Sequence, residues 1–197
     1  CRLEFETQAP LFKSNLAKDD GRYQVVLKQI KGINRTGLKI ADIGCGKGCY
    51  LKNLLEDVSD ARYFAIDLSE KVMKNIPEKV EKKQGILTNI PYPDNSFDVT
   101  YTTEALEHAV YTGNALKELI RVTKSDGIII VIDKNNDKLG TLEIDNWEQW
   151  FENDFFSKIA KENGLSLEII TNVSYDGGKN DGLFNAWILK GEIKNNE

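Results

Sequence analysis

The stretch Ile40-Ala41-Asp42-Ile43-Gly44-Cys45-Gly46-Lys47-Gly48-Cys49-Tyr50-Leu51 decides the fold of this chain. The run from Leu38 to Ile43 is mostly apolar, with Lys39 near its start and one carboxylate, which is typical of a buried strand. Glycines at three alternate positions then end the run. Leu51, Leu54 and Leu55 follow at helical spacing, so the stretch predicts a strand, a glycine-rich turn and a helix.

A turn of this kind can hold a ligand. Glycine suits a backbone with positive φ or one that approaches a ligand closely, because it has no Cβ. The helix start also offers unpaired N–H groups and the positive end of the helix dipole, which favour an anionic group. The dinucleotide fingerprint is G-x-G-x-x-G, whereas this loop reads G-x-G-x-G with Cys49 in place of the third glycine. This spacing disfavours a nicotinamide-dependent oxidoreductase and leaves a ligand-free glycine turn as the plain alternative.

Asp42 stands two residues before the first glycine, where a dinucleotide-binding strand is normally apolar. Together with Gly44, Gly46 and Gly48 it resembles motif I of the class I S-adenosylmethionine-dependent methyltransferases. The resemblance implies that S-adenosylmethionine is the cofactor and that Asp42 lies near its methionine end. It also implies that the loop, including Cys45, passes under the methionine and the ribose.

A second predicted strand, Ala61 to Asp67, ends in an acid 23 residues after Gly44. A carboxylate about 20 residues past the glycine turn is placed to accept from ribose hydroxyls. The resemblance therefore implies that Asp67, with Leu68 next to it, contacts the ribose. A brief third strand is predicted at 84–87.

The segment Ile90–Asp98, with the sequence IPYPDNSFD, resembles many small-molecule methyltransferases of the same family. These usually carry a preceding Gly-Asp pair, whose acid meets the adenine amino group. Here Gly85 is followed by Ile86, which removes that acceptor. We therefore expect backbone groups around Leu87 and Thr88 to hold the adenine.

The remaining pattern predicts an α/β fold: a Rossmann-like, doubly wound sheet of seven strands, mostly parallel with one antiparallel strand. An amphipathic helix is expected over 20–32, and the sheet should close with a strand at 165–173, a loop at 176–182 and a strand at 183–190. We expect an N-terminal arm at 1–19, one methyltransferase domain at 20–191 and a polar tail at 192–197.

Several further residues are candidates for the site. Arg22, in the first turn of the expected N-terminal helix, is either a surface charge or, as the resemblance implies, reaches the carboxylate of the cofactor. The backbone at Thr103 is implied to contact the methionine moiety. Glu104 and His108 follow that strand and are the catalytic candidates, with His108 either a general base or a residue that orders the next helix. The expected acceptor pocket is lined by Asn135, Asn136, Trp147 and Tyr175.

The acceptor is less well defined by the sequence. The C-terminal third loosely resembles bacterial methyltransferases that modify surface polysaccharides, which favours transfer to oxygen. A sugar hydroxyl would need a base, whereas a phosphate or phosphoramidate oxygen already carries charge. A small-molecule N-methyltransferase and a non-catalytic, cofactor-binding partner subunit stay open as alternatives.

Composition excludes other classes. The 197 residues are 41% hydrophobic, which suits one domain with a substantial core. The net charge is −5 without a basic run, so no nucleic-acid partner is expected. No apolar run approaches the roughly 20 residues of a membrane span, and three cysteines predict neither a disulfide framework nor a metal site. We expect a cytoplasmic protein with a portion upstream of Cys1, and the sequence does not determine its oligomeric state.

Overall fold

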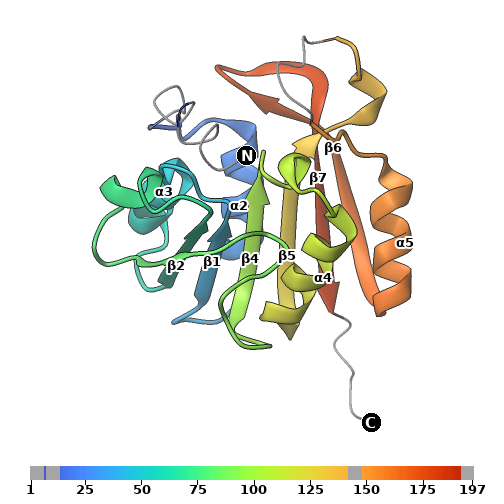
Figure 1. The fold of residues 1–197 in the computed structure, drawn as a ribbon. Helices are drawn as coiled ribbons and strands as arrows, with labels where there is room; N and C mark the ends of the chain where they lie inside the picture. The colour runs from blue at the N-terminus through green and yellow to red at the C-terminus, as the bar shows by residue number, and fades with distance from the viewer. Residues whose placement is uncertain (1–6, 8–13, 142–147, 192–197) are drawn as a thin grey trace.

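A computed structural model describes residue 7 and residues 14–141 and 148–191 of the chain. It contains a seven-stranded sheet in the order β3-β2-β1-β4-β5-β7-β6 (Figure 1). Strand β7 runs antiparallel to the other six strands, which all point in the same direction. The expected doubly wound fold with one antiparallel strand is thus confirmed. The strands are β1 (Lys39–Ile43), β2 (Arg62–Asp67), β3 (Glu81–Gln84), β4 (Phe97–Thr103), β5 (Thr123–Lys134), β6 (Leu165–Tyr175) and β7 (Lys179–Gly191).

Helices cover both faces of the sheet (Figure 1). The longer ones are α2 (Gly21–Lys31), α3 (Cys49–Asp57), α4 (Thr112–Val122) and α5 (Asn153–Asn163). Short 3-10 turns follow three strands: η2 (Val72–Asn75), η3 (Leu106–His108) and η4 (Asn136–Lys138). None of the described helices is long and apolar enough to cross a membrane.

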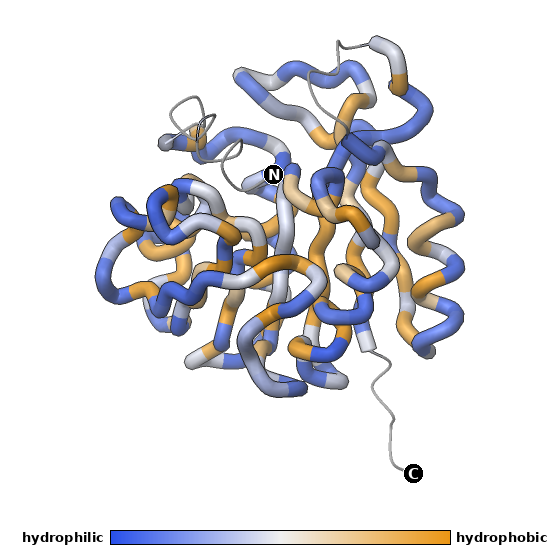
Figure 2. Tube along the Cα trace, in the orientation of Figure 1, coloured by the Kyte–Doolittle hydropathy of each residue, from blue (hydrophilic) through white to orange (hydrophobic). Residues whose placement is uncertain are grey.

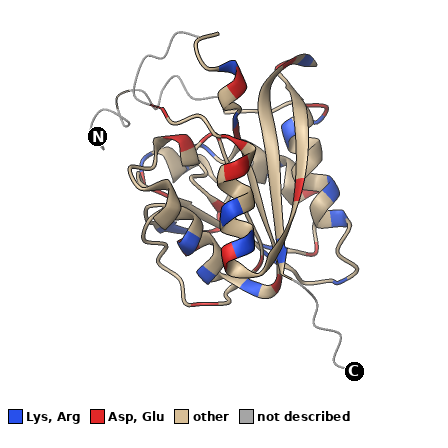
Figure 3. Cartoon of the chain, turned by 90° about the vertical axis from the view of Figure 1, so that its right-hand side faces the viewer, with Lys and Arg blue, Asp and Glu red and all other residues tan. Residues whose placement is uncertain are grey.

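Two hydrophobic clusters form the core, one on each face of the sheet. Side chains of α2 and α3 pack with Ile40, Ile130 and Ile132, whereas those of α4 and α5 pack with Ala41 and Ile129. Successive side chains of a strand point to opposite faces, so a continuous apolar run supplies both clusters. The apolar strands lie inside and the hydrophilic segments outside (Figure 2), and charged residues gather on helices and loops (Figure 3). The core therefore fixes the strand ends on which the site is built.

Some expected boundaries were wrong. The third strand ends at Gln84 instead of spanning 84–87, because Ile86 pairs with Asn89 in a turn. All its residues are exposed, so β3 lacks the apolar alternation that marks a strand in a sequence. The loop expected at 176–182 is shorter, since Tyr175 already pairs with Lys179. Positive φ at Gly177 and Gly178 allows this tight turn.

Candidate functional site

The glycine loop lies between β1 and α3, at the edge of the sheet where the parallel strands end. The backbone N–H groups of Gly44 and Cys45 donate to the carbonyl of Ile66 over 2.8 and 3.1 Å, which ties the loop to β2. Gly46 has φ of 50°, and a Cβ at this position would meet no atom within 4 Å. A Cβ at Gly48 would instead lie 2.7 Å from Ile76. Gly48 is therefore needed for packing, and Gly46 leaves room above the loop.

Asp67 ends β2 and holds this loop in place. Its carboxylate accepts from the N–H of Gly46 and from that of Ser69, each over 2.9 Å. Burial raises the pKa of Asp67, and these backbone N–H groups act against the rise. Each carboxylate oxygen can accept a second hydrogen bond. Asp67 is thus fixed by the backbone and keeps acceptor capacity at the edge, where Leu68 is half-buried.

Asp42 lies at the end of β1 and is almost completely buried. The hydroxyl of Tyr101 donates to its Oδ2 over 2.9 Å. Burial, opposed by this hydrogen bond, raises the pKa of Asp42 to about 8, and the charge of Asp67 adds to the rise. The carboxyl therefore holds a proton at neutral pH until a positive charge comes close.

Three buried polar atoms at this edge lack a hydrogen-bond partner within the described residues: Asp42 Oδ1, the Tyr50 hydroxyl and the Thr102 hydroxyl. They belong to the end of β1, the first turn of α3 and the end of β4. Native proteins rarely leave such atoms unpaired, and a bound ligand or water is the usual partner where no protein group serves. With the space over Gly46, they fit a polar ligand that spans β1 and β4.

Arg22 is buried, which excludes the surface-charge alternative. Its Nε and Nη2 donate to Asp20 over 3.0 and 2.8 Å. Nη1 donates to Glu104 over 2.6 Å, and Nη2 donates to Asp176 over 3.1 Å. The guanidinium therefore joins α2, the end of β4 and the β6–β7 turn, with most of its donors engaged by protein carboxylates. The implied contact of Arg22 with the cofactor carboxylate stays a prediction.

Glu104 follows Thr103, a half-buried residue at the end of β4, and has an unusual backbone. Its φ is 51°, in the left-handed region that a long side chain seldom adopts. The N–H of Glu104 donates to Ile132 over 2.9 Å, which fixes this conformation. Its side chain is 39% exposed, so the carboxylate lies at the surface of the edge.

His108 is half-exposed at the end of η3, with Nε2 3.4 Å from Oε1 of the buried Glu107. Lys134 donates to Glu107 and Glu148 over 2.6 and 2.8 Å. Burial and the neighbouring Glu107 raise the pKa of Asp133 well above its usual range. The sequence analysis missed Glu107, although its position next to the histidine was a signal that could have found it.

Glu107, His108 and Glu148 bring potential metal-ligand atoms within 4.8 Å of one another. The ammonium of Lys134 contacts both carboxylates, so a positive charge is already present among them. We therefore assign no metal to this group.

The residues that were expected to line the acceptor pocket make separate contacts with other parts of the chain. Asn135 caps η4 and donates to the Gly182 carbonyl over 3.3 Å, and Asn136 donates to Glu152 over 3.1 Å. Tyr175 is buried, with its ring 5.5 Å from the guanidinium carbon of Arg22. Trp147 lies outside the described residues. Leu87 and Thr88, expected near adenine, are half-buried after β3.

Comparison with known proteins agrees with this geometry. Residues 41–131 match the model of a methyltransferase-domain family. An uncharacterized protein of Methanocaldococcus jannaschii is 33% identical over 57% of this chain and 48% of its own length. A demethylmenaquinone methyltransferase of Lactobacillus johnsonii is 26% identical over 70% of this chain and 59% of its own length. The chain thus spans about half the length of the first of these relatives and under two thirds of the second.

Solved structures share the fold. A chain of the complex between the Haloferax volcanii Trm112 methyltransferase activator and a putative methyltransferase superposes with a TM-score of 0.72 at 16% identity, covering 100% of this chain and 99% of that one. The plantazolicin methyltransferase BpumL, in complex with S-adenosylhomocysteine, gives a TM-score of 0.68 at 18% identity over 88% and 83% of the two chains. Over residues 41–131 the chain is thus similar to a methyltransferase-domain family, and it shares its fold with solved methyltransferase structures.

Proposed function

We propose that this chain transfers a methyl group to an oxygen of a small molecule, for which a sugar hydroxyl of a glycan precursor is a suitable acceptor. The observation that carries the proposal is the group of buried atoms on Asp42, Tyr50 and Thr102 that have no hydrogen-bond partner among the described residues, beside the open space over Gly46. S-adenosylmethionine supplies a methyl group that is already activated by the sulfonium. The task left to the protein is to position the acceptor, which can lower a barrier by about 7–11 kcal/mol.

The positions of the residues at the ends of β1, β2, β3 and β4 indicate which part of the cofactor each would hold. The Gly44–Gly46 loop, including Cys45, would lie under the methionine and ribose, and Asp67 would accept from the ribose. Asp42 and the backbone of Thr103 would meet the methionine end, and backbone groups at 86–88 would meet the adenine.

Exposed apolar side chains support a small organic acceptor. Four of the five large apolar residues exposed within the described residues lie in loops after β3, β4 and β5: Ile86, Val110, Tyr111 and Leu139. These loops all leave the edge that carries the unpaired atoms. An apolar rim beside polar groups is typical of a small-molecule site. The relative that is named for demethylmenaquinone agrees with an acceptor of this class.

A neutral hydroxyl is favoured over an anionic oxygen. The carboxylates of Glu104 and Asp176 are 39% and 45% exposed at this edge, and they would repel a phosphate. A neutral hydroxyl must lose its proton during transfer, so it needs a base. His108 is the candidate, because its half-exposed imidazole follows β4 on the chain and lies at the end of η3.

Two measurements test the proposal. Calorimetry should show S-adenosylmethionine and S-adenosylhomocysteine binding, without binding of nicotinamide dinucleotides. Release of S-adenosylhomocysteine should then follow addition of hydroxyl acceptors from a panel of sugars, phosphates, phosphoramidates and amines. Cofactor binding without turnover on any acceptor would favour a non-catalytic subunit, and turnover on amines alone would favour N-methylation. Failure to bind the cofactor would contradict the proposal as a whole.

A further inference from the structure

Two exposed carboxylates lie on either side of one buried guanidinium. Glu104 and Asp176, here called the acidic pair, come from the end of β4 and the β6–β7 turn. They accept from Nη1 and Nη2 of Arg22 over 2.6 and 3.1 Å. The two carboxylates are therefore held one guanidinium apart, although 72 residues separate them in the sequence.

The arrangement places positive charge inside and negative charge outside. The side chain of Arg22 is 4% exposed, whereas those of the acidic pair are 39% and 45% exposed. Asp20, which is buried, accepts from both Nε and Nη2 of the same guanidinium. A ligand that approaches the edge therefore meets carboxylate oxygens before it meets the guanidinium.

The backbone supports both acids in an unusual conformation. Glu104 and Asp176 have φ of 51° and 43°, and they are two of the four described non-glycine residues with positive φ. Such a conformation is strained and persists only where surrounding contacts impose it. Here those contacts include two hydrogen bonds. The N–H of Glu104 donates to the carbonyl of Ile132, and the N–H of Asp176 donates to the carboxylate of Asp20.

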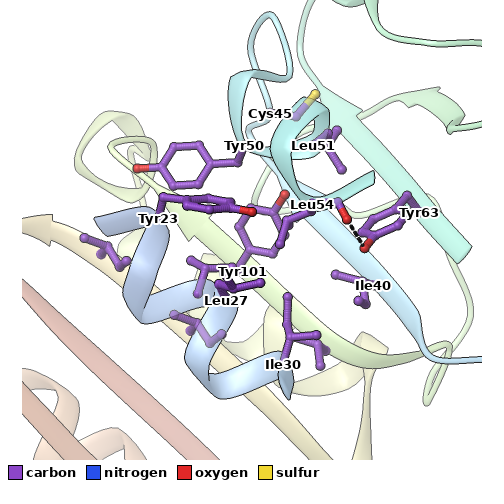
Figure 4. Packing of buried hydrophobic residues seen from close by; sticks show 14 of the residues in the cluster. Tyr23, Leu27, Ile30, Ile40, Cys45, Tyr50, Leu51, Leu54, Tyr63 and Tyr101 are labelled. Atoms are coloured by element: carbon purple, nitrogen blue, oxygen red, sulfur yellow. Dashed lines mark hydrogen bonds between the residues drawn. The ribbon is translucent and has the colours of Figure 1, made fainter. Parts of the chain in front are cut away.

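A second, independent feature points to a ligand beside the acidic pair. The Tyr50 hydroxyl is buried and has no hydrogen-bond partner within the described residues. Burial raises the pKa of Tyr50 well above its usual range, and the charge of the nearby Glu104 raises it further. Figure 4 shows the ring beside Tyr23, with the hydroxyl at its outer end, away from Leu54. Its oxygen can accept a hydrogen bond from a ligand donor.

We propose that the acidic pair and the Tyr50 hydroxyl bind an ammonium group of the methyl acceptor. An ammonium has three donors, which these oxygens can satisfy. This inference rests on the proposed methyl transfer and names the class of acceptor: a small molecule with a hydroxyl and a positively charged nitrogen. An amine held by two carboxylates stays protonated, so its nitrogen has no lone pair for reaction.

The methyl group therefore goes to the hydroxyl. The acceptor oxygen forms the new bond to the methyl carbon while the carbon–sulfur bond breaks and its electron pair stays on sulfur. The hydroxyl proton goes to a base, for which His108 is the candidate. The ammonium serves only to position the acceptor.

Glu104 follows Thr103, whose backbone would meet the methionine end of the cofactor. The assignment of this subsite to the acceptor therefore depends on Asp176, which lies between β6 and β7 and far from β1 and β2 in the sheet order. The glycine loop and Asp67 follow β1 and β2, whereas the acidic pair follows β4 and joins β6 to β7. The cofactor also carries an ammonium, on its methionine end, so the experiment must separate the two sources.

Matched probes test the inference by binding alone. Protein saturated with S-adenosylhomocysteine is titrated with ethanolamine, ethylene glycol and glycolate, which share a hydroxyl and differ in charge, and binding is followed by NMR chemical shifts. We expect ethanolamine to bind about tenfold more tightly than ethylene glycol, because hydrogen bonds to charged groups are the stronger ones. Glycolate should bind most weakly. Equal binding of the three probes would overturn the inference.

Variants identify the residues. Glu104→Gln and Asp176→Asn should each remove most of the preference for ethanolamine, while Glu162→Gln, an exposed acid of α5, should keep it. Tyr50→Phe serves where an acid variant fails to fold, because its hydroxyl has no described partner to lose. It should weaken ethanolamine binding in a stable protein. An unchanged preference in all three site variants would contradict the inference.

The source of the ammonium is decided by the cofactor product. In the variants of the acidic pair, the affinity for S-adenosylhomocysteine should stay within about twofold of the wild type, a margin of about 0.4 kcal/mol. A loss that equals the loss for ethanolamine would assign the acidic pair to the cofactor and overturn the inference. Absence of S-adenosylhomocysteine binding in the wild type would instead contradict the proposed function itself.

Discussion

Nη1 of Arg22 lies 2.6 Å from Oε1 of Glu104, which joins helix α2 to the end of strand β4 across 82 residues of sequence. The same guanidinium binds Asp20, whose side chain is 2% exposed. Burial raises the pKa of Asp20, but the hydrogen bond and charge of Arg22 outweigh burial and leave it below its usual value. The pair of Arg22 with Asp20 is therefore buried, whereas its pairs with Glu104 and Asp176 reach the surface of the edge.

Arg22→Ala should destabilise the protein strongly. It leaves the buried Asp20 carboxylate without its counter-charge, and breaking a buried pair in this way costs about 3–5 kcal/mol. Chemical denaturation followed by circular dichroism measures the free energy of unfolding. The matched control is Arg35→Ala, which removes a 43% exposed guanidinium from the exposed Asp126 and from the buried Asp98. Asp98 keeps Lys124 as a counter-charge at 2.7 Å, so the loss should be about 1 kcal/mol or less. Equal losses in the two variants would show that Arg22 is solvated.

Gly46→Ala should abolish most cofactor binding and affect folding only modestly. The new Cβ would enter the open space over the loop, where the cofactor is expected. Gly37→Ala is the matched control, since Gly37 has φ of 67° and a Cβ at this position would also have no atom within 4 Å. Both variants should lose about 1 kcal/mol of stability through backbone strain, and only Gly46→Ala should lose affinity for S-adenosylhomocysteine in calorimetry. Normal binding by Gly46→Ala would place the ligand elsewhere.

Asp67→Ala should weaken cofactor binding. The variant loses one or two hydrogen bonds to the ribose, each contributing about 0.5–1.5 kcal/mol net. It also releases the N–H of Gly46, which Asp67 fixes over 2.9 Å. Calorimetry with S-adenosylhomocysteine gives the change in affinity. Unchanged affinity would mean that the acid at the end of β2 only holds the loop.

Asp42 should make stability depend on pH. Its folded-state pKa of about 8 lies above the ordinary value of 3.8, so the folded state binds the proton more tightly. The stabilisation is complete below pH 3.8 and is lost as pH rises toward 8, by at most about 1.4 kcal/mol per pH unit. Asp42→Asn replaces the titrating carboxyl with an amide, so this pH dependence disappears. The free energy of unfolding of the variant should therefore rise relative to that of the wild type as the pH is raised from 5 to 8. Parallel pH profiles for the two proteins would contradict the raised pKa.

His108→Gln tests the base. If His108 accepts the hydroxyl proton, turnover should fall about 10²–10⁴-fold while cofactor affinity is kept. A small loss would indicate that the acceptor oxygen needs no base. A joint loss of thermal stability and cofactor binding would assign His108 a structural role at η3.

The sequence by itself determined the fold class and the places where the cofactor is expected. The mostly apolar run Leu38–Ile43 and the continuous apolar run Ile128–Ile132 predict buried strands, because a strand that is covered on both faces is rich in apolar residues. The glycine spacing and the acid of Asp67 locate the ligand edge, because loop chemistry and strand ends are local properties. The bounds of the third strand were predicted wrongly for a local reason too: β3 is polar at every position and has no periodic pattern of apolar residues.

Only the tertiary structure decided how charges are combined. Arg22, Glu104 and Asp176 are separated by 82 and 72 residues, and no local pattern predicts that one guanidinium joins them. The burial of Asp42, which raises its pKa, and the unpaired hydroxyl of Tyr50 depend on packing from α2, α3 and β4. Burial and long-range pairing arise from the whole fold, so the electrostatic character of the site follows from the sheet order that brings these strand ends together.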